Sequence, residues 1–253
     1  MKTNYHTHNA LCTHARGNVD DYCKFALEHG FTDLGISDHG PLLNPPFKRM
    51  TIFQFFQDYL KQIEEAKKKY AGKLNVYASL EMEYLSKDKK FLESLRGHVD
   101  YLVLGPHYYS KERPYYGNSA FHVQDEDTMR QYTELIEEAL DTGLFKILAH
   151  PDLFMTDYKN GYDELCEKYF RRIIEAAIRN NVLIEVNANG FRREDGKRGY
   201  PCREFFALVK EYDAPVIISS DAHDPENLVG PHMDKAEELV KELGLKLVEK
   251  IEF

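Results

Sequence analysis

Histidines and carboxylates, spaced in short pairs, are the residues of this chain whose types and spacing could do chemistry. The chain has 11 histidines in 253 residues. Seven of them, together with acidic residues, stand at or shortly after the ends of short apolar runs: His6, His8, His14, Asp38, His39, Glu81, His107, His150, Asp221 and His223. Imidazole and carboxylate groups are the ligands that Zn, Fe and Mn ions use in proteins. If the fold gathers these run ends, the pattern predicts a metal centre.

These histidines could instead have a purely structural role in packing and hydrogen bonding. One histidine at a strand end is more often a hydrogen-bonded packing residue than a ligand. Seven at equivalent positions favour a shared function. The remaining four, His29, His98, His122 and His232, fall outside the pattern and are interpreted as surface or packing residues. Cys12, although close to His14, is likewise interpreted as loop packing.

The apolar runs themselves predict the elements that must position these groups. Strands are expected at 2–6, 32–37, 75–82, 100–104, 145–149, 182–187 and 215–220. Helices are expected at 19–29, 51–69, 127–142, 163–180 and 234–243. Nearly continuous apolarity, as in the run 101–104, is typical of parallel strands covered on both faces.

Seven strand–helix units in a chain of this length predict one domain, residues 1–253, folded as a (β/α) barrel. A doubly wound open sheet is the alternative. That fold usually has a glycine-rich phosphate loop after its first strand, where this chain has His6-Thr-His8. In a barrel the carboxyl ends of all strands meet at one mouth, so the histidines would share one pocket.

Composition and charge narrow the function classes. The chain is 43% hydrophobic and carries a net charge of −9, which disfavours long nucleic acids and anionic membranes as partners. No apolar run reaches the roughly 18 residues of a membrane span, and the N-terminus lacks an apolar signal-peptide core. The four cysteines form no CxxC pair, so we expect a reducing, cytoplasmic setting.

In order and position, these motifs resemble the PHP (polymerase and histidinol phosphatase) superfamily from His6 to His223. Within it the chain looks most like the monofunctional histidinol-phosphate phosphatases. That closer resemblance depends on Ser37-Asp-His-Gly-Pro-Leu42, Leu80-Glu-Met-Glu-Tyr84 and Glu185-Val-Asn-Ala-Asn-Gly-Phe-Arg192, with Tyr200-Pro201 following. The family's common His-Gly is His14-Ala15 here, a small departure in the loop. Amidohydrolases also begin with His-x-His, but they often use a bridging lysine that this chain lacks at the corresponding strand ends.

The resemblance implies a distorted (β/α)7 TIM-like barrel, which agrees with the count of seven units, and up to three divalent metal ions (Zn, Mn or Fe). One ion would take His6, His8, Glu81 and Asp221; a second Glu81, His107 and His150; a third His14, His39 and His223. Glu81 would bridge the first two ions. Glu83, two residues further on, would support the site or lie at its rim.

The implied activity is hydrolysis of L-histidinol phosphate to L-histidinol and phosphate, by attack of a metal-bound hydroxide on phosphorus. Arg192 is the first candidate for binding phosphate; Arg198 and Arg16 are weaker candidates, and Tyr116 belongs to an aromatic loop that would wall the pocket. Asp38 would act in catalysis or, more simply, orient a ligand histidine.

Two other functions stay open. The same site could act on another small phosphate ester, such as a phosphodiester, a nucleotide or phosphotyrosine. A metal-binding or regulatory protein with a degenerate site is a third hypothesis, disfavoured by the complete set of ligands. The expected partner is a small-molecule phosphate ester, and the expected assembly is a monomer or a small homo-oligomer.

Overall fold

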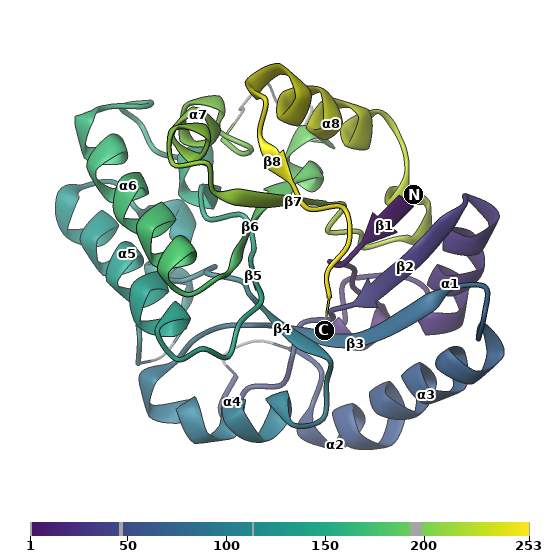
Figure 1. Ribbon diagram of the computed structural model, residues 1–253. Helices are drawn as coiled ribbons and strands as arrows, with labels where there is room; N and C mark the ends of the chain where they lie inside the picture. The colour runs from purple at the N-terminus through teal and green to yellow at the C-terminus, as the bar shows by residue number, and fades with distance from the viewer. Residues whose placement is uncertain (1, 46–47, 113, 193–198, 253) are drawn as a thin grey trace.

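The short apolar runs pair side by side as one parallel sheet that curls into a ring (Figure 1). The computed structural model describes residues 2–45, 48–112, 114–192 and 199–252. Eight strands follow one another in chain order: β1 Lys2–Asn4, β2 Phe31–Ile36, β3 Asn75–Met82, β4 Tyr101–Leu104, β5 Ile147–Leu148, β6 Leu183–Asn187, β7 Pro215–Ser219 and β8 Lys246–Leu247. The predicted parallel barrel is confirmed, with a short eighth strand that the apolar pattern did not predict.

Helices surround the ring between successive strands. They are α1 Val19–Glu28, α2 Ile52–Gln54, α3 Leu60–Lys69, α4 Lys89–Arg96, α5 Glu126–Leu140, α6 Glu164–Arg179, α7 Arg203–Glu211 and α8 Pro231–Leu243. The helix predicted at 51–69 is divided by a π-helical turn, Phe55–Tyr59, and neither α4 nor α7 was predicted individually. No helix in the described parts of the chain has the length and apolarity needed to cross a membrane.

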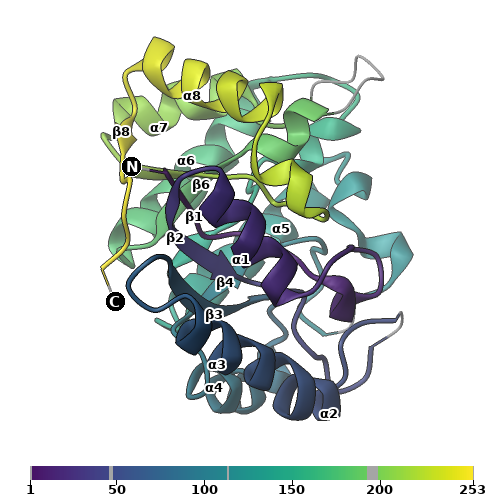
Figure 2. The same ribbon diagram turned by 90° about the vertical axis from the view of Figure 1, so that its right-hand side faces the viewer.

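Alternation along the strands separates two apolar layers. On β4, Tyr101 and Val103 point into the barrel, whereas Leu102 and Leu104 join the larger cluster that packs against the helices. The inner cluster also contains Ile251 from the C-terminal segment. This segment crosses one end of the barrel, and both termini lie there, opposite the loops that follow the strands (Figure 2).

The barrel closes at the end where the predicted ligands lie. Just beyond β1, Thr7 pairs in parallel with Ala222, and the His8 amide donates to the Ala222 carbonyl at 2.8 Å. A second isolated bridge joins His39 to Glu81, which continues the pairing of β2 with β3. Main-chain bonds therefore fix the strand ends relative to one another at the mouth.

Candidate metal centre

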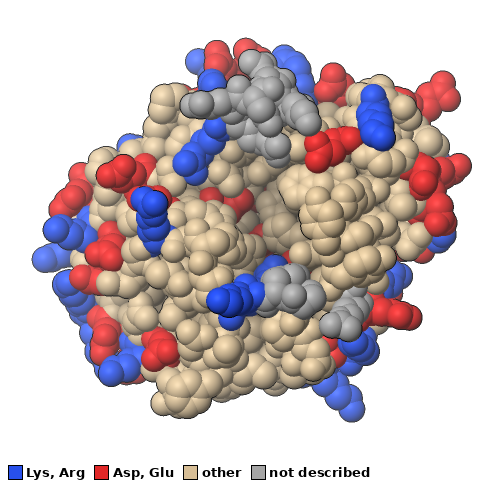
Figure 3. Space-filling view, turned by 180° about the vertical axis from the view of Figure 1, so that it is seen from behind, with Lys and Arg blue, Asp and Glu red and all other residues tan. Residues whose placement is uncertain are grey.

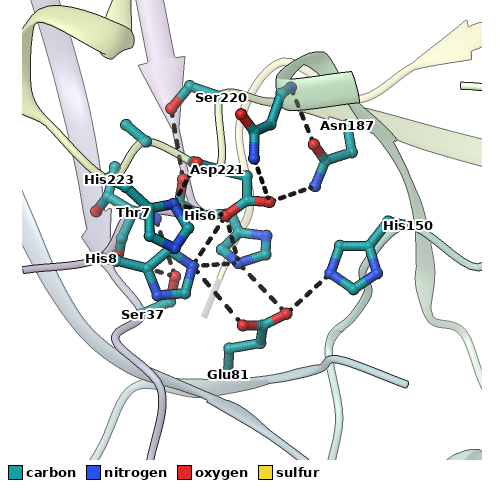
Figure 4. A network of polar contacts seen from close by, with 12 residues as sticks. His6, Thr7, His8, Ser37, Glu81, His150, Asn187, Ser220, Asp221 and His223 are labelled. Carbon is teal, nitrogen blue, oxygen red and sulfur yellow. Dashed lines mark hydrogen bonds and ion pairs between the residues drawn. The ribbon is translucent and has the colours of Figure 1, made fainter. Parts of the chain in front are cut away.

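The barrel mouth brings the predicted ligands from six strands and one loop into a single cluster. Figure 4 shows six of them: His6, His8, Glu81, His150, Asp221 and His223. The face that carries the mouth is hollowed near its centre, and acidic side chains are visible inside the hollow (Figure 3). Three sets of predicted ligands have their nitrogen or oxygen atoms within 4.8 Å of one another: His6, His8 and Glu81; Glu81, His107 and His150; and His8, His39 and His223.

The first set corresponds to the expected first metal position. His6 Nε2 lies 3.1 Å from His8 Nε2, and His8 Nε2 lies 2.9 Å from Asp221 Oδ1. The Nε2 of His6 is 3.6 Å from Glu81 Oε1 and 3.7 Å from Asp221 Oδ1. These four side chains thus point their donor atoms at one small volume.

The second set shares Glu81 with the first. His150 Nε2 is 3.0 Å from Glu81 Oε1, and His107 Nε2 is 3.5 Å from the same oxygen. The expected bridging position of Glu81 is therefore the position that the structure shows, although its role as a ligand stays a prediction.

The expected ligands of the third ion, His14, His39 and His223, include the two that are more open to solvent, His14 and His223. His14 Nε2 lies 3.2 Å from His223 Nε2, and the His14 ring centroid is 5.0 Å from that of His39. His8 also reaches this group, with its ring 4.1 Å from the ring of His223. The expected trio of His14, His39 and His223 is brought together, and His8 lies between it and the first set.

Hydrogen bonds to the far side of the rings favour metal binding by Nε2. Four Nδ1 atoms meet oxygens that only accept: His6 at Glu185 (2.8 Å), His14 at the Cys12 carbonyl (3.1 Å), His107 at Glu83 (2.8 Å) and His223 at the Asp221 carbonyl (3.0 Å). Each Nδ1 must therefore carry the proton, and in the neutral ring each Nε2 presents a lone pair toward the centre.

Unsatisfied polar atoms at the centre agree with a cation site. Glu81 Oε2 is buried and makes no hydrogen bond in the described structure. His39 Nδ1 lies only 2.8 Å from it, but neither atom has a hydrogen-bond partner in the described structure. Buried polar atoms are rarely left in this state unless a metal or water satisfies them. The residues present therefore fit divalent cations.

The charges of the cluster depend strongly on one another. Burial opposes the charged form of Glu81 and Asp221, but the surrounding histidines outweigh it and hold both pKa values well below the ordinary range. Burial also opposes protonation of His8, yet Asp221 and Asp38 raise its pKa to about 9. Burial and the neighbouring His8 lower the pKa of His223 to about 4. Ionised carboxylates at the centre create a field that attracts cations.

The backbone supports the side chains at unusual dihedral angles. His150 and Asp221 have positive φ values of 30° and 48°. Such conformations cost a non-glycine residue about 1–3 kcal/mol and are concentrated at functional sites. The strand ends here turn abruptly, which aims both side chains into the mouth.

Two residues of β6 hold several predicted ligands at once, and the sequence patterns did not assign them this role. Glu185 accepts hydrogen bonds from His6 Nδ1 and from the His150 amide, the latter at 3.1 Å. Asn187 donates to Glu185 at 2.8 Å and to Asp221 at 3.1 Å. A carboxylate within the apolar run Leu183–Asn187 was the available sign of this role.

The predicted substrate and catalytic residues lie around the cluster in different settings. Asp38 is buried behind His8, 3.6 Å from its Nδ1, and accepts from the His39 amide at 2.9 Å, which agrees with an orienting role. Arg192 ends the 3-10 segment Ala188–Arg192 and reaches Asn189 at 3.4 Å. Arg16 is exposed, and its amide donates to the His223 carbonyl. Tyr116 is 83% exposed and packs edge-on against His122.

Arg198 lies outside the described residues. Arg49 was not predicted, because nothing in its local sequence marks it. It lies in the connection after β2, where its Nη2 donates to Glu83 at 2.9 Å. Glu83 also accepts from His107, a contact that agrees with the supporting or rim position expected for it.

A (β/α) barrel whose mouth gathers histidine and carboxylate donors in overlapping sets defines the class of metal-dependent barrel hydrolases. Residues 4–189 match the PHP domain, and the chain belongs to that family.

Relatives of similar length share the match. A "Probable histidinol-phosphatase" of Deinococcus radiodurans is 27% identical over 253 residues, covering 96% of this chain and 94% of the relative. The histidinol-phosphatase of Bacillus subtilis is 23% identical, covering 88% and 94%. Among solved structures, histidinol phosphate phosphatase from Lactococcus lactis, crystallised with zinc, L-histidinol and phosphate, superposes with a TM-score of 0.75. It is 16% identical, and the match covers 98% of this chain and 95% of that chain.

Proposed function

We propose that this protein is a metal-dependent phosphomonoesterase that hydrolyses L-histidinol phosphate to L-histidinol and inorganic phosphate. The observation that carries the proposal is the convergence of three overlapping donor sets, two of which share Glu81 and two of which share His8. The relatives named histidinol-phosphatase, which match over most of their own length, support the choice of substrate.

The residues that would hold up to three divalent ions (Zn, Mn or Fe) are those of the three sets, with His14 and Asp221 added: His6, His8, His14, His39, Glu81, His107, His150, Asp221 and His223. When bound, such ions neutralise phosphoryl oxygens and lower the pKa of water to about 7. The net charge of −9 does not oppose this, because the ions would reverse the local charge at the mouth.

The exposure of the side chains increases from the centre of the site to its rim. Glu81 is 1% exposed, whereas the side chains of His107 and His223 are each 25% exposed. Substrate therefore approaches from the outer histidines, and the bridging carboxylate lies below it. Glu185, Glu83 and backbone carbonyls hold Nδ1 protons and so keep each Nε2 aimed at the centre.

Location and assembly are proposed with the function. All four cysteines are free and buried, which supports a reducing, cytoplasmic setting. We propose a monomer or small homo-oligomer that binds a small molecule rather than long nucleic acid.

The test is phosphate release by metal-analysed protein, with L-histidinol phosphate beside a generic aryl phosphate. We expect kcat/KM of about 10⁴ M⁻¹s⁻¹ or more for L-histidinol phosphate, far above the aryl ester. Treatment with a chelator should abolish turnover, and adding back Zn, Mn or Fe should restore it. Equally weak turnover of both esters would overturn the substrate and retain the hydrolase. The absence of turnover with metal bound would favour a binding or regulatory role.

A further inference from the structure

Arg49 places a nearly buried positive charge beside the metal centre. Its side chain is 7% exposed, and its Nη2 donates to Glu83 Oε1 at 2.9 Å. A guanidinium stays protonated in proteins, so burying it requires a carboxylate or another anion close by.

Glu83 couples this charge to a predicted metal ligand. The same Oε1 accepts from His107 Nδ1 at 2.8 Å, and Oε2 accepts from the His107 amide at 3.3 Å. His107 Nε2 in turn lies 3.5 Å from Glu81. The guanidinium is therefore separated from a predicted metal ligand by one carboxylate, at the outer, more exposed side of the cluster.

Glu83 balances the charge of Arg49, but the divalent ions that the donor sets would hold add further positive charge beside it, which favours binding of an additional anion. The oxygens of a phosphoryl group match the planar fork of donors that a guanidinium presents. A guanidinium has five N–H donors, so it can contact a carboxylate and a phosphoryl oxygen at the same time.

We propose that Arg49, oriented by Glu83, binds the phosphoryl oxygens of the substrate and of the phosphate product. The inference rests on the proposed phosphatase function and specifies which arginine recognises the anion. It assigns Arg49 to phosphate binding and Glu83 to positioning. Substituting Arg49 should therefore weaken phosphate binding, whereas substituting Glu83 should lower the metal content.

The experiment compares metal-loaded wild type with Arg49→Ala, Arg49→Lys, Glu83→Gln and the control Arg179→Ala. Arg179 is exposed and pairs with Asp141 on the barrel exterior. Each protein is titrated with inorganic phosphate by calorimetry, and its bound metal is quantified. Kinetics with L-histidinol phosphate and an aryl phosphate then separate KM from kcat.

We expect Arg49→Ala to keep its metal and to bind phosphate at least about tenfold more weakly, with a similar rise in KM. Arg49→Lys should lie between it and wild type, because an ammonium keeps the charge and loses the fork. Glu83→Gln should instead lower the metal content at the His107 position, and Arg179→Ala should match wild type.

Unchanged phosphate affinity in Arg49→Ala would overturn the proposal, as would metal loss that accounts for its whole effect. Failure of wild type to bind phosphate would overturn it too. If Arg49→Ala does not fold, Arg49→Lys is the test of the proposal. Wild-type phosphate affinity in folded Arg49→Lys would contradict recognition of phosphate by the planar donors of the guanidinium. Phosphate binding is measured without turnover, so loss of the L-histidinol phosphate assignment alone leaves the Arg49 result interpretable.

Discussion

Glu185 Oε1 accepts a hydrogen bond from His6 Nδ1 at 2.8 Å, which joins β6 to the predicted ligand that follows β1 across the barrel mouth. The other oxygen of Glu185 accepts from the His150 amide, which follows β5. One buried carboxylate thus orients parts of two donor sets. Its influence on metal binding comes through these contacts, since His6 and His150 are the groups that face the centre.

Replacing Glu185 by Gln should weaken metal binding by about 10–100-fold with the fold retained, because Gln keeps the shape and loses the charge that fixes the His6 proton. Competition with a chromophoric chelator measures this affinity. Glu65→Gln, on an exposed helical face, is the matched control. Wild-type metal affinity in Glu185→Gln would show that the hydrogen bond does not support the ligand.

Glu81→Ala should have a larger effect than any variant outside the donor sets, because Glu81 belongs to two of them. We expect metal loss from both sets, near-complete loss of phosphate release and an unchanged far-ultraviolet circular dichroism spectrum. Elemental analysis of purified protein gives the metal content. Glu93→Ala, on an exposed face of α4, should retain metal and activity. Full metal content in Glu81→Ala would contradict the assignment of the cluster.

Gly105→Ala should displace the carboxylate of Glu81 while leaving Glu81 itself unsubstituted. A Cβ at this position would lie 2.3 Å from Glu81 Oε1 and 2.6 Å from its Cδ, closer than side-chain atoms pack. We expect at least about a tenfold loss of metal affinity. Gly97→Ala is the control, because the nearest atom to its new Cβ would be 3.5 Å away. If both variants bind metal like wild type, Glu81 can shift without consequence and its placement is not critical.

Asp33 offers a test of stability at the opposite end of the barrel. Its buried carboxylate accepts from Tyr77 at 2.9 Å and Asn75 at 3.1 Å, and pairs with Lys250 at 3.0 Å. Burial opposes ionisation, but the hydrogen bonds from its neighbours outweigh it and lower the pKa of Asp33. Stability from this group is therefore complete above its unfolded pKa and is lost as pH falls through the lower folded value.

Asp33→Asn should destabilise the protein by about 1–3 kcal/mol at neutral pH, and the difference from wild type should shrink under acidic conditions below about pH 4. Urea unfolding at several pH values measures both quantities. The exposed substitution Asp58→Asn provides the comparison. A difference that stays constant down to acidic pH would mean that ionisation of Asp33 does not contribute.

The local patterns of the chain were sufficient to predict that the candidate ligands lie together at one end of the barrel. Parallel strands deliver their C-terminal residues to one edge, so His6, Glu81 and Asp221 could be expected together without coordinates. The interruption of 51–69 by a π-helical turn was beyond this reasoning, because both helix types show the same apolar spacing over a few residues. The short strand β8 was not predicted because both of its residues are exposed and no apolar run marks it, whereas the equally short β5 is buried.

By itself, the sequence determined the alternation of strands and helices and the chemical types of the donors at each strand end, since these follow from local periodicity and residue identity. Only the tertiary structure decided that Arg49 meets Glu83 and that Glu185 supports both His6 and His150. Those contacts join segments 34–179 residues apart in the chain, and their geometry depends on how the barrel closes rather than on any local pattern.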